Sequence, residues 1–231
     1  MKALTLSGAL TADEDSAVHS GAWFASLGPS LQRALLSKAA TWRVGHGQLI
    51  AGQGVVPDTW FGLAAGAMRV SVVTDHGKEG VTHIVRAGEW FGDVPLLAAK
   101  PLPYSCHTLG PCTLLMMRRG QLCELLAHHP GLSEALSRLN WEHALHVMDR
   151  HVAFVTQPLE PRVRELLGTL GDNMATPGSR AVHGQLKQSD LALLLGASRQ
   201  RVNQAIARLG PRSASEQSAR RRDPSDVDVR I

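Results

Sequence analysis

The 231-residue chain lacks the patterns that mark disulfide-rich, metal-binding and membrane-spanning proteins. Its three cysteines are Cys106, Cys112 and Cys123, an odd number with no metal-ligand spacing. Such a set is typical of the reducing cytoplasm, where we expect the protein to be located. Since the sequence has no run of about 18 apolar residues, we also expect no membrane-spanning segment.

The chain also has none of the short catalytic motifs that a sequence can reveal. The patterns Gly-x-Ser-x-Gly and His-Glu-x-x-His and the phosphate-binding loop are all absent. The acidic run at residues 13–15 and the pair His128-His129 are better interpreted as solvated surface than as catalytic groups. We therefore expect a binding protein rather than an enzyme.

The N-terminal segment has a short apolar stretch that only superficially resembles a signal peptide. The stretch is interrupted, and Asp13, Glu14 and Asp15 follow it directly. We expect residues 1–20 to form a flexible tail.

Residues 21–128 have the pattern of a small β-structure. Between Trp42 and Met117, glycines separate short apolar runs. The clearest alternation is at Met68, Val70 and Val72, followed by a turn at 74–77 and by Val81, His83 and Val85. Many short strands at regular spacing are typical of a barrel or sandwich.

A long helix is predicted over residues 129–157, because glycine and proline are absent between Gly131 and Pro158. Its first apolar stripe consists of Leu132, Leu136, Leu139 and His143. Its second stripe consists of Trp141, Leu145, Met148, Val152 and Val155. A helix of about 37 Å is longer than one small barrel can cover, so we expect the second stripe to meet a second copy of the chain. The alternative is one helix that packs only within its own chain.

The segment Leu186–Leu209 predicts two short helices joined by a tight turn. Gly196 ends the first helix and Ser198 is placed to cap the second. Val202, Ile206 and Leu209 recur at the spacing of a buried helix face. The opposite face presents Arg199, Gln200, Arg201, Asn203 and Gln204. A helix with this polar face can read base edges in DNA, whereas a plain helix pair would explain only the apolar residues.

The charge distribution agrees with a DNA-binding C-terminal part. Residues 1–157 hold 12 Lys or Arg and 12 Asp or Glu, whereas residues 158–231 hold 12 and 8. The net charge of +4 therefore lies entirely in the last third of the chain. A basic domain beside a neutral one fits the neutralisation of DNA phosphates, although a solvated surface of this charge is also common.

The helix pair resembles the helix-turn-helix of the Crp/Fnr superfamily of bacterial transcription regulators. The positions that carry the resemblance are Leu191-Ala192, Gly196, Ser198, Arg199, Val202 and Leu209. The resemblance implies base contacts from Arg199, Gln200, Arg201 and Gln204, and phosphate contacts from Gln188 and Ser198. It also implies double-stranded DNA and RNA polymerase as partners, and a homodimer in which Trp141, Leu145, Met148 and Val152 form the interface.

The front half resembles a cyclic-nucleotide-binding β-roll through Gly52-Gln53-Gly54, Asp58 and Gly66. The fold class expected is therefore α+β, with the β-roll at 21–128, the dimerisation helix at 129–157 and a winged helix-turn-helix domain at 158–210. Pro158 and Pro161 break the chain at the hinge before that domain. The basic segment 211–231 is expected to be a disordered tail or a degenerate wing, because only Val227, Val229 and Ile231 alternate as in a strand.

The same resemblance places an effector pocket at Gly92, Asp93, Val94, Tyr104 and Ser105. In cyclic-nucleotide binders a glutamate holds the ribose and an arginine holds the cyclic phosphate. Asp93 can replace the glutamate, but Pro103 or Tyr104 stands where the arginine is needed. A buried phosphate without its cation is costly, so we expect no cyclic AMP.

Other effectors have little support in the sequence. No cysteine precedes Cys106, so the N-terminal cysteine cluster of iron–sulfur members is absent. Haem ligation by His83, Cys106 or His107 and redox sensing through Cys106 or Cys112 have no supporting motif. We therefore expect no identifiable cofactor and an unknown small-molecule effector. The alternative function is a β-roll that binds a small molecule, or is structural, without using its helix-turn-helix for specific DNA recognition.

Overall fold

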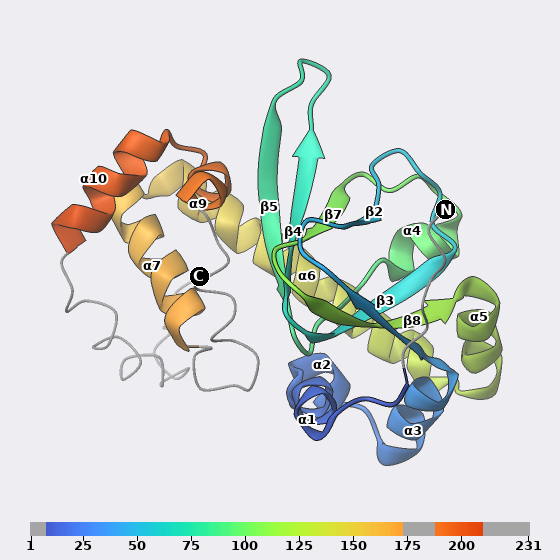
Figure 1. The fold of residues 1–231 in the computed structure, drawn as a ribbon. Coiled ribbons are helices and arrows are strands. Elements are labelled where there is room, and N and C mark those ends of the chain that lie inside the picture. Colours follow the sequence, from blue (N-terminus) through green and yellow to red (C-terminus); the bar gives the residue numbers. More distant parts are fainter. Residues whose placement is uncertain (1–7, 173–187, 210–231) are drawn as a thin grey trace, which may run out of the picture.

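The computed structural model describes residues 8–172 and 188–209 of the chain (Figure 1). Three short helices, a β-roll, a long central helix and a helical C-terminal unit follow one another along the sequence. Among the described residues no helix is both long enough and apolar enough to span a bilayer.

The N-terminal helices are α1 (Ala12–Ser20), α2 (Ala22–Ala25) and α3 (Pro29–Lys38). The expectation of a flexible tail was therefore wrong for residues 12–20. Thr11 caps α1 through a reciprocal pair of bonds, because the Glu14 amide donates to Thr11 Oγ1 at 3.3 Å and the Thr11 amide donates to Glu14 Oε2 at 2.8 Å. The preceding residues 1–7 lie outside the described part.

Glu14 is buried rather than solvated, which corrects the interpretation of the acidic run. Its carboxylate accepts hydrogen bonds from Thr113 Oγ1 at 2.6 Å and from Arg43 Nη2 at 2.7 Å. Burial alone would raise the pKa of Glu14, but these bonds and the one from the Thr11 amide together lower it. The carboxylate thus fastens α1 to the first and last strands of the roll.

Two four-stranded antiparallel sheets form the β-roll, as the alternation predicted. The first sheet has the order β1 (Ala40–Val44), β8 (Cys112–Arg118), β3 (Thr59–Ala65) and β6 (Trp90–Phe91). The second has the order β2 (Leu49–Ala51), β7 (Ser105–Thr108), β4 (Ala67–Val73) and β5 (Glu79–Arg86). The predicted hairpin is β4–β5, in which Met68 pairs with Val85 and Val70 with His83.

Hydrophobic packing holds the roll to the helices around it. One cluster fills the interior of the roll and includes Phe61, Met68 and Leu114. A second cluster joins the N-terminal helices to the roll through Trp23, Trp60 and Trp90. The rings of Trp60 and Trp90 are centred 4.6 Å apart, which is ordinary aromatic packing.

Three further helices are α4 (Asp93–Ala98), α5 (Arg119–His128) and α6 (Gly131–Thr156). The first half of α6 packs on the roll through Leu132, Leu136 and Leu139, all of which are buried. This confirms the first apolar stripe predicted from the sequence. Figure 1 shows α6 running behind the sheets from the roll to the C-terminal unit.

The C-terminal unit consists of α7 (Leu159–Asp172), α9 (Gln188–Leu195) and α10 (Arg199–Leu209). Val163 of α7, Ala192 of α9 and Val202 of α10 meet in a small shared core. The segment 211–231, where a tail or wing was expected, lies outside the described residues.

Candidate DNA-binding helices and effector cavity

Helices α9 and α10 form the predicted helix-turn-helix. Gly196 lies between them with φ +59°, a left-handed conformation that glycine adopts without a Cβ penalty. The Ala197 amide donates to the Ala192 carbonyl at 3.0 Å, which closes the end of α9. Ser198 then caps α10, since its Oγ accepts a hydrogen bond from the Arg201 amide at 3.3 Å.

Gly196 has a second constraint besides its backbone conformation. A Cβ added here would lie 2.8 Å from Cε2 of Phe154, on the last turns of α6. The φ angle therefore requires glycine at this turn, and a larger residue would in addition have to displace the exposed Phe154 ring.

We expect the substitution Gly196→Ala to lower the free energy of unfolding by about 1–2 kcal/mol, because alanine is strained in the left-handed region. Urea unfolding measures this loss. Gly168→Ala is the matched control, because Gly168 lies within α7 with open space around it. That control should raise stability by about 0.5–1 kcal/mol. Equal stabilities of the Gly196→Ala variant and the wild type would contradict the assigned strain.

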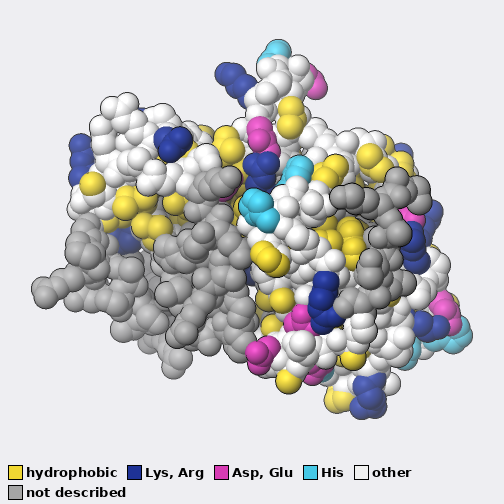
Figure 2. Space-filling model, in the orientation of Figure 1, with side chains coloured by type: hydrophobic (Ala, Val, Ile, Leu, Met, Phe, Trp, Pro, Cys, Tyr) yellow, Lys and Arg dark blue, Asp and Glu magenta, His cyan; other side chains and the backbone are white. Residues whose placement is uncertain are grey.

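Helix α10 separates its two faces as the sequence predicted. Val202 and Ala205 are buried, and Ile206 and Leu209 pack against the same small core. All six side chains predicted to contact DNA are exposed, namely Gln188, Ser198, Arg199, Gln200, Arg201 and Gln204. In Figure 2, Lys and Arg side chains lie along the outer edge of this helical unit.

Two of the exposed polar residues are already connected within the helix pair. Gln188 Oε1 accepts a hydrogen bond from Asn203 Nδ2 at 3.2 Å, which links the start of α9 to the middle of α10. At the far end of α10, Arg208 Nη1 lies 3.0 Å from Glu160 Oε1 of α7. The ion pair between Arg208 and Glu160 thus involves the last turn of α10, whereas Arg199 and Arg201 lie in its first turn.

The helix-turn-helix is docked on the rest of the chain through α9. Leu194 packs with Val81 and Ile84 of β5. Arg150 Nη2 of α6 donates to the Leu194 carbonyl at 3.0 Å, and Arg69 Nη1 of β4 lies 3.9 Å from Asp190 Oδ1. The contact leaves α10 on the outer side of the unit, as Figure 1 shows.

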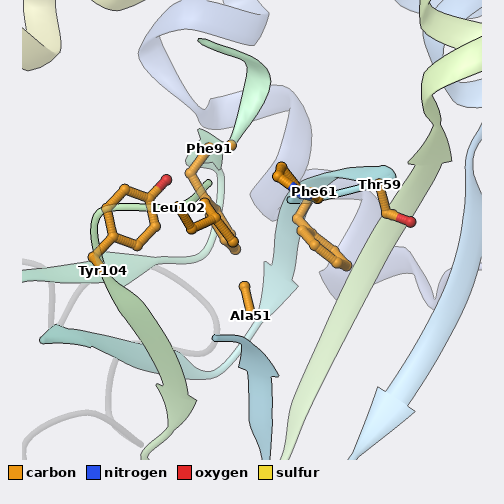
Figure 3. Close-up of a pocket in the computed structure, with 8 residues that line it drawn as sticks. Ala51, Thr59, Phe61, Phe91, Leu102 and Tyr104 are labelled. Atoms are coloured by element: carbon orange, nitrogen blue, oxygen red, sulfur yellow. The ribbon is translucent and has the colours of Figure 1, made fainter. Parts of the chain in front are cut away.

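A small cavity lies in the roll. Its lining consists of Ala51, Pro57, Thr59, Phe61, Phe91, Gly92, Leu102 and Tyr104. Figure 3 shows the aromatic rings of Phe61, Phe91 and Tyr104 around this space. The cavity is small, since its volume is about 200 Å³ even with open solvent included.

The cavity brings together only part of the predicted effector pocket. Gly92 and Tyr104 line it, and burial raises the pKa of the Tyr104 phenol, which therefore stays neutral. Val94 is 52% exposed, and Ser105 Oγ accepts a hydrogen bond from the Gln53 amide at 3.0 Å. Neither Val94 nor Ser105 lines the cavity.

Asp93 is also absent from the cavity lining, because it is bound to α6. The side chain is 2% exposed, and its Oδ2 accepts a hydrogen bond from Asn140 Nδ2 at 2.8 Å. Sequence reasoning missed Asn140, which lies between the two apolar stripes of the helix. No local pattern signals a partner 47 positions away.

The two buried thiols, Cys106 and Cys112, give no support to redox chemistry. Burial raises the pKa of the Cys106 thiol to about 12, and burial also raises that of Cys112, to about 11. Both thiols therefore stay protonated, whereas thiol chemistry proceeds through the thiolate. Within residues 8–172 and 188–209, no three His, Cys, Asp or Glu side chains are grouped so that they could hold a metal ion.

Comparison with known proteins agrees with both halves of this architecture. Residues 41–129 match the cyclic nucleotide-binding domain family. The CRP-like cAMP-activated global transcriptional regulator of Mycobacterium tuberculosis is 24% identical over 186 residues, which cover 80% of this chain and 83% of the relative. Over most of its length the chain is thus similar to a Crp-like transcriptional regulator, and residues 41–129 match the domain from which that similarity takes its β-roll.

Two solved structures show how far the shared fold of Crp/Fnr regulators extends here. FixK2 from Bradyrhizobium japonicum has a TM-score of 0.65 at 15% identity, over 74% of this chain and 84% of that one. The c-di-GMP-responsive global regulator CLP from Xanthomonas campestris has a TM-score of 0.63 at 18% identity, over 79% and 91%. The fold is thus shared across both the roll and the helical C-terminal unit.

The chain departs from the pattern of cyclic-nucleotide binders at the positions where the resemblance places ligand contacts. Among the described residues that line the cavity none is charged, and Tyr104, which with Pro103 is where the resemblance would place an arginine, is one of them. The carboxylate expected at the ribose, Asp93, is bound instead to Asn140.

Proposed function

We propose that this regulator is a homodimer that reads an inverted-repeat DNA site with α10. The observation that carries the proposal is the exposed polar first half of α10 on a helix-turn-helix. Arg199, Gln200, Arg201 and Gln204 are all exposed, while Val202 and Ala205 anchor the opposite face. Arginine and glutamine have the donor patterns that pair with guanine and adenine in the major groove.

Dimerisation is supported by the second apolar stripe of α6. Its exposed fractions in the single chain are 63% for Trp141, 38% for Leu145, 59% for Met148, 56% for Val152 and 67% for Val155. A run of large apolar side chains along one helix face is typical of a surface that a partner covers. We propose the matching stripe of a second α6 as that partner.

A salt series tests DNA binding most directly. The protein is titrated against a random duplex and against a selected inverted repeat at increasing salt. A DNA-binding protein shows an affinity that falls steeply with salt, because bound counterions are released when phosphates are neutralised. The alternative, a β-roll that binds a small molecule or is structural, predicts weak binding without preference for the selected site.

We propose that the effector is not cyclic AMP. The cAMP-activated relative from Mycobacterium tuberculosis shares 24% identity with this chain. The described residues that line the cavity nevertheless include no cation, and the acidic residue Asp93 is bound to α6. An anionic ligand would enter an apolar site without its charge partner, which is costly.

We expect calorimetry with cyclic AMP to show no binding tighter than 10 µM, which corresponds to about −7 kcal/mol. Tyr104→Arg is the matched variant, because it places a cation at the cavity and should strengthen binding relative to the wild type. Sub-10 µM binding by the wild type, about −7 kcal/mol or better, would show that another group holds the phosphate.

The remaining partners follow from the proposed activity. A regulator of this kind acts with RNA polymerase at promoters, in the cytoplasm that the cysteine pattern predicts. The effector of the roll stays an unidentified small molecule, and we propose no resident cofactor.

A further inference from the structure

The inward face of α6 changes from apolar to polar halfway along the helix. Leu136 and Leu139 are buried against the roll. His143, His146 and Arg150 continue the same face at spacings of four, three and four residues. The second half of α6 therefore meets β5 and α9 through polar side chains, on the side away from the proposed dimer stripe.

A pair of histidine rings joins α6 to β5. The ring of His146 is centred 5.2 Å from that of His83 on β5, with the planes at 77°. His83 Nε2 lies 2.9 Å from Glu89 Oε2, just after the strand. His143 is half-buried on the same face of α6, whereas His146 is exposed in the single chain. We call His83, His143 and His146 the histidine joint.

The histidine joint lies between two contacts that connect the domains. Before it, Asn140 of α6 binds Asp93, at the edge of the roll. After it, Arg150 of α6 donates to the Leu194 carbonyl of α9. One helix face thus connects the roll, the histidine joint and the helix-turn-helix.

The charged groups around the histidine joint both attract and repel a proton on its α6 imidazoles. The groups facing it are Arg86, Glu89, Asp93, Glu142 and Arg150, and Glu165 of α7 in turn faces Arg150. Glu89 already contacts His83, so a charge on His83 has a partner. A charge on His143 would be repelled by one on His83 but attracted by Asp93, Glu89 and Glu142. A charge on His146 would be repelled by His83, Arg150 and Arg86 and attracted by Glu89 alone.

We propose that the histidine joint is a pH-sensitive contact that holds α6 on β5 when its imidazoles are neutral and loosens when they are protonated. Because Arg150 of α6 donates to α9, the same loosening weakens the contact between α6 and the helix-turn-helix. The contact needs no DNA and no second copy of the chain, so it goes beyond the proposed DNA recognition.

The direction of the pH effect follows from the protonation of the two α6 histidines. The pKa of His143 is lowered chiefly by burial, and that of His146 by burial and by the neighbouring His83 and Arg150. An unfolded histidine has a pKa near 6.5, so it binds a proton before these two do. The stabilisation that the neutral histidines give to the contact between α6 and β5 is therefore complete above about pH 6.5 and is lost as the pH falls below it. His143 carries most of it, because His146 is the more exposed.

Hydrogen exchange of the full-length protein without DNA tests the proposal. The amides of residues 140–150 are followed at pH 7.5 and pH 5.5, corrected for the intrinsic pH dependence of exchange. We expect opening to become more frequent at the lower pH, because the opened state binds protons more readily than the closed one. The double variant His143→Gln/His146→Gln should lose this dependence. His128→Gln should keep it, because His128 is exposed at the end of α5.

Two results would overturn the proposal. One is equal protection of the wild-type helix at both pH values, and the other is an unchanged pH dependence in the folded double variant. If the double variant fails to fold, NMR titration of the wild-type imidazoles decides instead. His143 and His146 should then titrate below the ordinary histidine range together with the change in exchange, and titration without that change would refute the contact. Failure to bind DNA affects none of these measurements.

Discussion

The double substitution Leu145→Glu/Met148→Glu is expected to convert a dimer into monomers and to weaken binding to an inverted repeat by about a hundredfold or more, because linked binding sites lose their shared avidity. Both side chains lie on the exposed stripe of α6, where a second copy would bury them. In a two-fold interface each glutamate would face apolar side chains and the glutamates of the partner. Burial of an unpaired charge costs about 3–5 kcal/mol, enough to dissociate a micromolar dimer.

Sedimentation at micromolar concentration measures the first effect, and a DNA titration measures the second. Val147→Glu is the matched control, because Val147 is 64% exposed on the same helix but lies outside the stripe. This variant should remain dimeric and bind DNA as the wild type does. A monomeric wild type would refute the proposed interface, and a dimeric double variant would place the interface on another surface.

The elements predicted correctly are those whose signal is local. Alternation at Met68, Val70 and Val72 is enough to define β4, and its partner strand follows directly after a tight turn. Gly196 and Ser198 mark the end of one helix and the start of the next, because backbone conformation and capping depend on single residues. The apolar spacing in α6 likewise identified Leu132, Leu136 and Leu139 as its buried face.

The features that the sequence did not reveal depend on distant partners. Glu14 looked like part of a solvated acidic run, yet Thr113 lies 99 positions away and holds its carboxylate. Asp93 was expected to contact a ligand, yet its carboxylate accepts a hydrogen bond from Asn140. A polar residue has the same local pattern whether it is solvated or paired in the core, so only the three-dimensional fold distinguishes the two.

The candidate functional sites show the same difference between local and distant signals. The exposed face of α10 could be read from helical spacing alone, and all the residues expected on it are exposed. The small cavity of the roll could not be predicted, because it is assembled from loops and strand ends that include Ala51, Pro57 and Leu102. Of the expected pocket residues, only Gly92 and Tyr104 line the cavity.

Arg199→Ala and Arg201→Ala are each expected to cost about 1–3 kcal/mol at the specific site and to relax the preference at one base pair. Both arginines are exposed in the first turn of α10, where a recognition helix contacts base edges. A guanidinium can donate two hydrogen bonds to one guanine, and alanine can make neither of them. Gln200 and Gln204 should favour adenine or act through water.

In the proposed dimer the two recognition helices are about 34 Å apart, so the half-sites should be centred about one DNA turn apart.

Selection from a randomised duplex, followed by footprinting, measures both the affinity and the sequence preference. Arg208→Ala is the matched control on the same helix, because Arg208 pairs with Glu160 in the last turn. That variant should keep the wild-type preference. Neutralising Arg220–Arg222, which lie outside the described residues, should weaken all sequences alike and flatten the salt dependence. Protection of a single half-site, or an unchanged preference in both Arg199→Ala and Arg201→Ala, would mean that a surface other than α10 reads the DNA.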